Sequence, residues 1–317
     1  MLSRTADHLY WMARYTERAE NTARMLDVAL QTAMLPQSQF DAEQAWRAML
    51  GISELQGAFD AKYETLDVKN VLAFMVSDTA NPSSIVSCLT AARENARAVR
   101  GVLTTEVWET QNATWLELRE RIASDGDPGE FFEWVKHRCH LSRGVTLGTM
   151  LADEAMVFIR LGTFLERADS TARILDVKYH DAQEDTQSGV THDLLTQREF
   201  YYWAALLRSV AGFEIYRKVY RDSITPARVA ELLMLRADMP RSLLACMAQV
   251  VQDLKAVRND VSAETERLAG KMHAELQFAR IEDILDAGID QSLGKFMENV
   301  YKLGNGISRD FLVPLGA

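Results

Sequence analysis

The chain is poor in the residues that interrupt helices or cross-link small folds. Its 317 residues include only 6 prolines and 16 glycines, too few for an all-β protein, in which turn residues recur about every ten positions. The three cysteines, Cys88, Cys139 and Cys246, lie far apart and form no CxxC pair. That spacing argues against a structural zinc site and a disulfide framework, and it is typical of proteins from a reducing compartment.

Long apolar runs and basic clusters are missing as well. An uninterrupted apolar run such as residues 71–76 is far shorter than the roughly 20 residues that a membrane-spanning helix needs. Arg4, Asp7 and His8 break up the start of the chain, so the apolar segment of a secretory signal cannot form there. The formal net charge is −10 and the arginines alternate with acidic residues, which disfavours binding to nucleic-acid phosphates or an anionic membrane. We expect a cytoplasmic protein that binds neither.

What the chain does have is helical periodicity along nearly its whole length. Apolar residues recur at intervals of three and four, and no alternation of period two persists for more than a few residues. The fold class that this pattern predicts is all-α. The expected helices cover residues 2–34, 40–63, 68–77, 83–103, 106–123, 129–142, 148–181, 193–221, 226–237, 240–268, 270–287 and 289–303.

Proline and glycine mark several expected helix ends. Asn81-Pro82 and Thr225-Pro226 each combine an N-capping residue with a proline at the first helical position. Residues 304–306, with the sequence Gly-Asn-Gly, predict the C-terminal end of the last long helix. These signals set the expected boundaries of the helices near both positions.

One stretch of sequence occurs twice. Residues 1–30 align without a gap on residues 150–179, with 12 identical positions. Weaker matches follow at a nearly constant offset, and they pair Trp46 with Trp203, Pro82 with Pro240, and Cys88 with Cys246. Met239 stands where the first copy has Asn81, so we expect the second copy to begin that helix differently.

The repeat predicts a tandem duplication. The two copies would be residues 1–149 and residues 150–317, which we expect to fold as one compact unit. Each copy would form a helical bundle, and a pseudo-twofold axis would relate the two bundles. The period of about 150 residues is too long for a helical solenoid. Matching cysteines within apolar helices are expected to be core residues.

The residues that the copies share include charged ones at fixed spacing. Glu20 precedes Arg24, and Asp169 precedes Arg173, by four residues, which is the favourable order for an ion pair within one helix. Exposed pairs contribute little stability, so a shared pattern of charges indicates a defined role. The candidate binding or structural residues are Glu17, Arg18, Glu20, Arg24, Glu166, Arg167, Asp169 and Arg173.

Three interpretations of these charges remain open. They could form a solvated surface, or a buried ion network that fixes the register of the two repeated helices. They could also line a cleft between the repeats, where Arg24 and Arg173 would bind the carboxylate or phosphate of a ligand. The sequence does not decide among these three.

Other residues that could carry chemistry do not form a recognisable site. His137, Cys139 and His140 are close in sequence, but at helical spacing Cys139 points about 160° away from His137, which is the i−3 partner of His140, so the three do not converge. The chain has no HExxH or helical Glu-x-x-His pattern for a metal and no Gly-rich phosphate loop. We therefore predict no catalytic residue, no metal ion and no cofactor.

The segments ERAENTAR (residues 17–24) and ERADSTAR (residues 166–173) resemble the Glu-Arg motif of the bacterial alpha-E domain family. The resemblance implies an all-helical fold with the motif at Glu17-Arg18 and Glu166-Arg167. Members of this family are typically encoded beside, or fused to, a circularly permuted ATP-grasp ligase and a transglutaminase-like protease.

That context implies a non-catalytic accessory or scaffold protein in ATP-dependent peptide (amide-bond) synthesis. Its partners would be the ATP-grasp ligase and a transglutaminase-like protein. The alternative is an enzyme or ligand-binding protein that uses a Glu/Arg-lined cleft between the repeats for a carboxylate-bearing, peptide-like substrate. In the enzyme, Glu17 and Glu166 would be the acid/base groups. A structural dimer module without a ligand is a third possibility.

Overall fold

The computed structural model describes residues 1–34, 39–124, 126–186 and 192–312. Within these residues all regular structure is helical, which confirms the predicted all-α class. Among the same residues no helix has a stretch long and apolar enough to cross a bilayer.

The helices differ widely in length. The first half contains α1 (Ser3–Ala33), α2 (Gln39–Ile52), α3 (Gln56–Asp60), α4 (Val68–Leu72), the π-helical η1 (Ala73–Ser77), α5 (Ile85–Ala98), α6 (Thr105–Ala123) and α7 (Pro128–Thr149). The second half contains α8 (Glu154–Thr186), α9 (His192–Ser209), α10 (Phe213–Tyr220), α11 (Pro226–Leu235), α12 (Leu243–Ala256), α13 (Ala263–Gln277), α14 (Ile281–Ala287), α15 (Ile289–Ile307) and the π-helical η2 (Ser308–Leu312).

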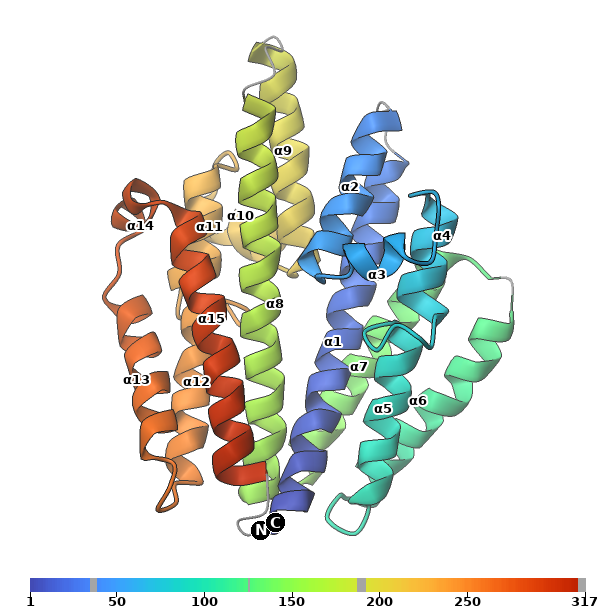
Figure 1. Cartoon of the computed structure of the whole chain (residues 1–317), viewed down its shortest axis with the longest axis vertical. Coiled ribbons are helices and arrows are strands. Elements are labelled where there is room, and N and C mark those ends of the chain that lie inside the picture. Colours follow the sequence, from blue (N-terminus) through green and yellow to red (C-terminus); the bar gives the residue numbers. More distant parts are fainter. Residues whose placement is uncertain (35–38, 125, 187–191, 313–317) are drawn as a thin grey trace.

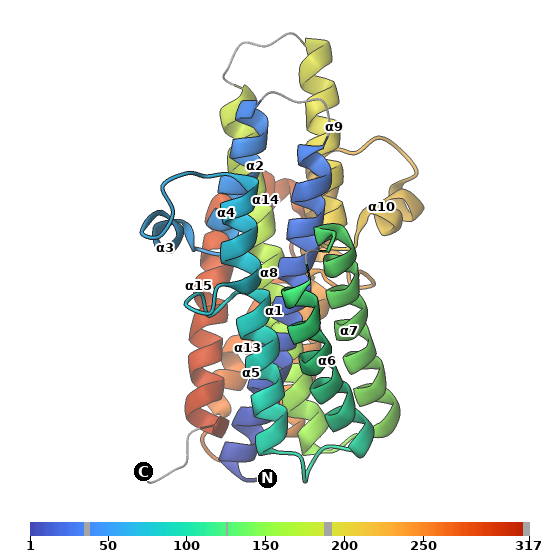
Figure 2. The same ribbon diagram turned by 90° about the vertical axis from the view of Figure 1, so that its right-hand side faces the viewer.

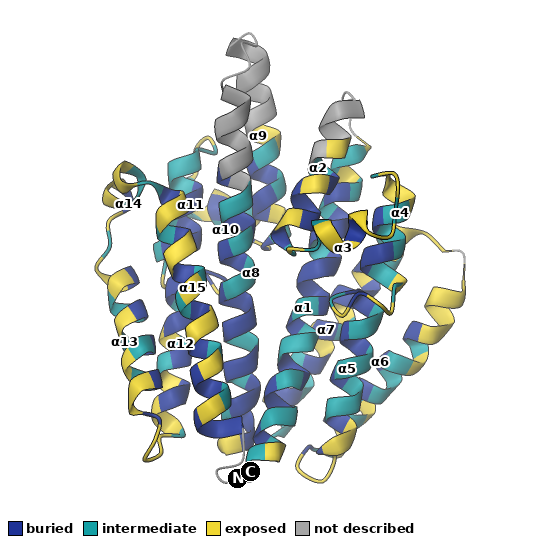
Figure 3. Ribbon diagram, in the orientation of Figure 1, coloured by how far each residue is buried: buried dark blue, intermediate teal, exposed yellow. Residues whose placement is uncertain are grey.

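The long helices α1 and α8 lie side by side at the centre of the molecule (Figure 1). They run in the same direction, and the amino group of Met1 pairs with Glu154 at the start of α8, at 2.5 Å. Buried residues follow one another along both helices (Figure 3). Because the other helices cover them, charged side chains that α1 and α8 carry at their centre are removed from water.

Each central helix has its own set of neighbours. In the first half α1 packs against α5 and α7, and α6 packs against both of these, so that all three cover one side of α1 (Figure 2). In the second half α8 packs against α12 and α15, and α13 packs against both. The order of packing is the same in the two halves. The duplication and its pseudo-twofold axis stay predictions.

The two halves also exchange contacts beyond the central pair. Helix α2 packs against α8 as well as α1, and α9 packs against α1 as well as α8. The short η2 near the end of the described chain returns to α1. Each half therefore buries part of the other.

The prediction that Asn81-Pro82 begins a helix is wrong. Helix α5 begins at Ile85, where the hydroxyl of Ser84 accepts a hydrogen bond from the Ser87 N–H at 3.2 Å. Asn81 instead stabilises the preceding turn, because its side-chain amide donates to the Phe74 carbonyl oxygen at 3.1 Å.

The second copy begins the matching helix in the same way, contrary to our expectation. The hydroxyl of Ser242, which aligns with Ser84, caps α12 by accepting from the Ala245 N–H at 3.0 Å. At Thr225-Pro226 the prediction is confirmed, since Thr225 caps α11 and Pro226 is its first residue.

Other boundaries moved for reasons of packing. The expected helices at residues 193–221 and 240–268 are each divided in two, at the turns before α10 and α13. Residues 304–306 do not end the last helix, because α15 continues to Ile307. A Cβ atom on Gly306 would overlap the hydroxyl of Thr265, so this glycine allows α15 and α13 to approach closely.

The closest approach of α1 and α8 depends on two small residues. A Cβ atom on Gly162 would overlap the Tyr10 carbonyl oxygen and would lie 3.2 Å from the Cβ of Ala13. Ala13 and Gly162 occupy the same position of the two repeats, one helical turn before Glu17 and Glu166. The small residues thus let the two backbones meet just before the repeated Glu-Arg pairs.

We expect Gly162→Ala to lower the free energy of unfolding by about 1–3 kcal/mol, because the added methyl overpacks the crossing of α1 and α8. The matched control is Gly144→Ala in α7, where an added Cβ meets no atom within 4 Å. This control should be stabilising by about 0.5–1 kcal/mol, as alanine favours a helix over glycine. Urea unfolding followed by circular dichroism measures both. Equal effects of the two substitutions would contradict a close helix crossing at Gly162.

Candidate functional site

The two Glu-Arg pairs of the repeats bind each other across the α1–α8 interface. Glu17 on α1 accepts hydrogen bonds from Arg167 on α8, with Nε–Oε1 and Nη2–Oε2 distances of 2.9 and 3.0 Å. Glu166 on α8 accepts in the same way from Arg18 on α1, at 2.6 and 3.1 Å. Each helix therefore supplies the glutamate for the other's arginine, and both pairs have the two-point geometry that makes Arg–carboxylate pairs strong.

Further arginines surround the same carboxylates. Arg14 donates to Glu166 at 2.7 Å. Arg241, in the turn before α12, donates to Glu17 at 2.8 Å and to Glu20 at 2.6 Å. We refer to the whole set as the Glu-Arg network; its members are Glu17, Glu20, Glu166, Arg14, Arg18, Arg24, Arg143, Arg167 and Arg241.

Arg143, on α7, joins the network from a third side. Its Nη2 donates to Glu17 at 3.0 Å and also to Glu20. Neither Arg143 nor Arg241 was predicted, because neither lies in the two segments that carry the repeated Glu-Arg pairs. Arg14 lies in that segment, but threonine replaces it in the second copy.

The remaining predicted residues form pairs within their own helices. Arg24 donates to Glu20 at 2.9 and 3.1 Å. Arg173 donates to Asp169 at 2.8 Å and also contacts Glu54. Both pairs have the predicted four-residue spacing. All eight predicted residues are thus engaged in ion pairs, and whether those pairs also serve a ligand stays a prediction.

The glutamates of the network are buried, and the arginines keep them charged. Glu17 and Glu20 have exposed fractions of 1% and 0%. Burial alone would raise the pKa of Glu17, but the guanidinium groups of Arg167 and Arg241 outweigh it and hold that pKa well below its usual range. Burial would likewise raise the pKa of Glu20, but the guanidinium groups of Arg241 and Arg143 outweigh it and lower that pKa to about 2. The carboxylates therefore stay charged and paired at neutral pH.

Positive charge is in excess in this region. The Glu-Arg network holds six arginines and three glutamates. When the adjoining Arg173, Asp169 and Glu54 are included, arginines still outnumber carboxylates by two (seven against five). Since arginine does not lose its proton in proteins, the excess charge is permanent and favours anions nearby.

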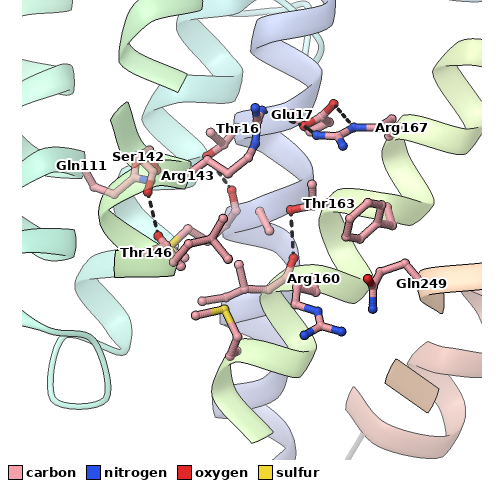
Figure 4. A pocket seen from close by; sticks show the side chains of 16 residues that line it. Thr16, Glu17, Gln111, Ser142, Arg143, Thr146, Arg160, Thr163, Arg167 and Gln249 are labelled. Atoms are coloured by element: carbon pink, nitrogen blue, oxygen red, sulfur yellow. Dashed lines mark hydrogen bonds and ion pairs between the residues drawn. The ribbon is translucent and has the colours of Figure 1, made fainter. Parts of the chain in front are cut away.

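A cavity of about 220 Å³ lies beside the network, between α1, α6, α7, α8 and α12 (Figure 4). Its charged lining residues are Glu17, Arg143, Arg160 and Arg167. Apolar walls are formed by side chains of α1, α7 and α8, namely Met12, Ala13, Leu147, Met156, Ile159 and Phe164. Neither Arg24 nor Arg173 lines this cavity.

The histidines and cysteine of the HRCH stretch do not converge. Cys139 is buried, and its Sγ lies 3.5 Å from the Thr16 carbonyl oxygen. The His140 ring instead lies 3.0 Å from Arg24, while His137 is exposed to solvent. Cys88 and Cys246 are fully buried in α5 and α12, as expected of core residues.

The fold and the network define a helical protein built around two Glu-Arg pairs that bind reciprocally. Residues 1–312 match Alpha-E, a family described as "a predicted alpha-helical domain with a conserved ER motif". The chain belongs to this family. That the Glu-Arg pairs at the α1–α8 interface are this motif stays a prediction.

Its relatives are bacterial and longer. Uncharacterized proteins of Mycobacterium bovis and Mycobacterium tuberculosis are each 25% identical over 312 residues, which cover 90% of this chain and 34% of theirs. The chain thus spans about a third of the length of these curated relatives. No solved structure matches the chain.

We expect Glu166→Gln to lower the free energy of unfolding by about 3 kcal/mol, the lower end for a buried pair, because it leaves the half-buried Arg14 and Arg18 without a carboxylate. The control is Glu298→Gln on α15, which removes an exposed ion pair to Lys302 and should leave stability nearly unchanged. Chemical unfolding at pH 7 compares the two variants. A loss as small for Glu166→Gln as for the control would show that the network contributes little stability.

The network should also make the protein sensitive to acid. Because the pKa of Glu20 falls from its usual 4.5 to about 2 in the folded chain, its contribution to stability is complete above pH 4.5. As the pH falls from there toward 2, the unfolded chain takes up the proton first and the contribution is lost. The stability difference between the unmodified protein and Glu20→Gln should therefore shrink between pH 5 and pH 3. Unfolding measured at several pH values tests this, and a constant difference would contradict the lowered pKa.

Proposed function

We propose that the chain is a non-catalytic accessory protein that acts with an ATP-grasp peptide (amide-bond) ligase in the bacterial cytoplasm. A transglutaminase-like protein of the same system would be a second partner. The observation that carries the non-catalytic role is the state of the Glu-Arg groups. The glutamates are buried, and their oxygen atoms are already bound by arginines of the network. This arrangement suits a rigid framework.

The electrostatics of the glutamates support this proposal over the enzyme alternative. A general acid or base works best when its pKa lies near the pH of the reaction. Although burial opposes the effect, arginine partners lower the pKa of Glu17 and of Glu166. Carboxylates that hold their charge so firmly are weak bases, and each is already surrounded by guanidinium groups. Acid/base catalysis by Glu17 and Glu166 is therefore disfavoured.

Asp253 is the carboxylate whose pKa comes closest to neutrality in this region. Burial raises its pKa to about 6, against the opposing effect of its ion pair with Arg160. Asp253 does not line the cavity, however. It is placed to position Arg160 and lacks direct access to a ligand in that space.

The length of the relatives supports an accessory role. In the mycobacterial proteins the matching region makes up about a third of the chain, so there it is covalently joined to further sequence. In the longer proteins this region is part of the same chain as its neighbours. As a separate subunit it could do the same work if it binds those neighbours. A ligase is the partner that we propose for this chain.

The test is co-purification of the tagged chain, from its own bacterium, with an ATP-grasp ligase. We expect the ligase at near-equal amounts by mass spectrometry and a single complex in size-exclusion chromatography. Adding the purified chain should raise ATP turnover by the ligase, while the chain alone should hydrolyse no ATP. An unrelated helical protein with the same tag is the control. A chain that purifies without the ligase and leaves its ATP turnover unchanged would overturn the proposal.

A further inference from the structure

The cavity beside the Glu-Arg network has room for a small organic group. Its volume is about 220 Å³, whereas an engineered apolar cavity of about 150 Å³ is known to hold benzene. Met156, Ile159 and Phe164 of α8 supply an apolar wall. Leu147, with an exposed fraction of 63%, lies where the cavity meets solvent. A ligand that fills this space has an apolar part.

Cationic hydrogen-bond donors face the same space. Arg143 uses Nη2 for Glu17 and Glu20 and Nη1 for His140. Among the described residues its Nε has no hydrogen-bond partner. The Arg143 side chain is 29% exposed, and it stands where arginines outnumber carboxylates. A ligand carboxylate at this end would neutralise part of the excess charge and accept a charge-assisted hydrogen bond.

Hydrogen-bond acceptors line other parts of the cavity. The hydroxyl groups of Thr16, Thr146 and Thr163 donate to carbonyl oxygens of their own helices, at 2.8, 2.8 and 3.0 Å. Their oxygen atoms therefore remain available only as acceptors. Gln111 donates through Nε2 to the Ser142 hydroxyl at 2.8 Å, which leaves its Oε1 as an acceptor too. Such groups suit an N–H donor on a ligand.

We propose that this cavity binds a free α-carboxylate that carries an N–H group and a short aliphatic side chain on its α-carbon. Arg143 receives the carboxylate, the hydroxyl and amide oxygens receive the N–H, and the aliphatic group packs against the apolar wall of α8. A free aliphatic amino acid and the C-terminal residue of a peptide share this chemistry. The proposal goes beyond the accessory role and does not depend on a ligase.

Phosphate fits the cavity less well than this ligand. A phosphate group offers no apolar surface for Met156, Ile159 and Phe164, and it would place several acceptor oxygens against the threonine oxygens. The α-carboxylate of an aliphatic residue matches the cationic, acceptor and apolar parts of the lining. The Glu17 carboxylate also lines the cavity, but Arg143, Arg167 and Arg241 already bind its oxygens.

Methionine methyl groups report binding directly. Two of the 13 methionines, Met12 and Met156, line the cavity. With 13C-methyl methionine labelling, we expect N-acetyl-L-leucine to shift these two signals in a saturable titration. The signal of Met272, a buried residue of α13 outside the cavity, should stay in place. The titration uses the purified chain alone, so its failure would leave the proposed partnership with a ligase standing.

Changes to the ligand test each part of the proposal. N-acetyl-L-leucinamide, which lacks the carboxylate, and N-acetylglycine, which lacks the side chain, should each bind about tenfold more weakly or worse. Comparable binding of the leucinamide would overturn the proposal, as would the absence of any shift at Met12 and Met156 with both N-acetyl-L-leucine and L-leucine. Titration with L-leucine distinguishes a free amino acid from the C-terminal residue of a peptide as the source of the ligand. Binding of leucine alone identifies a free amino acid, and binding of N-acetyl-L-leucine identifies a peptide end; either result supports the shared chemistry.

A pair of variants on α7 tests the assigned arginine. Arg143→Gln should weaken N-acetyl-L-leucine binding about tenfold or more. Arg138→Gln should not, because Arg138 faces Thr114 of α6 and does not line the cavity. Equal affinity of the two variants would remove Arg143 from the site. If Arg143→Gln fails to fold, the comparison of carboxylate with amide ligands still decides.

Discussion

The ion pairs that Glu17 and Glu166 make with Arg167 and Arg18 impose the main constraint on this structure. Removing an ion from water costs several kcal/mol, and only a well-placed partner offsets that cost. Here four such ions meet between two parallel helices, and each helix provides half of each pair. A shift of α8 along α1 would leave all four without partners. We therefore expect these charges to help specify the register of the two central helices.

Backbone geometry and charge depend on each other at this interface. The small residues Ala13 and Gly162 let α1 and α8 approach closely one turn before the glutamates. That approach brings the four charged side chains within hydrogen-bond distance. Arg143 and Arg241 then add guanidinium groups from α7 and from the turn before α12. The result is an arginine-rich wall beside a cavity whose other sides carry apolar side chains and neutral polar groups.

The charged residues of α1 and α8 could be predicted from the sequence, but the arginines that reach them from other elements could not. Repeated Glu-Arg pairs in helical segments predicted paired charges, because spacing within one helix is a local property. Arg143 and Arg241 approach from other segments, so their place in the network depends on tertiary packing, which no local spacing encodes. Some predicted helix ends were wrong for a related reason. Asn81-Pro82 carries a start signal, but the Asn81 side chain bonds the Phe74 carbonyl oxygen and Ser84 caps the helix instead. The glycine at 306 accommodates Thr265, although glycine more often ends a helix.

The reciprocal pairing has a consequence for cooperativity. Each half of the chain supplies a glutamate and an arginine whose partners lie in the other half, and α2 and α9 each pack across the division. Within either half alone, these charged groups lack their partners. A bundle that formed first would therefore carry unpaired ions at its surface. We therefore expect the halves to fold and unfold as one unit, with intermediates of a single folded bundle disfavoured.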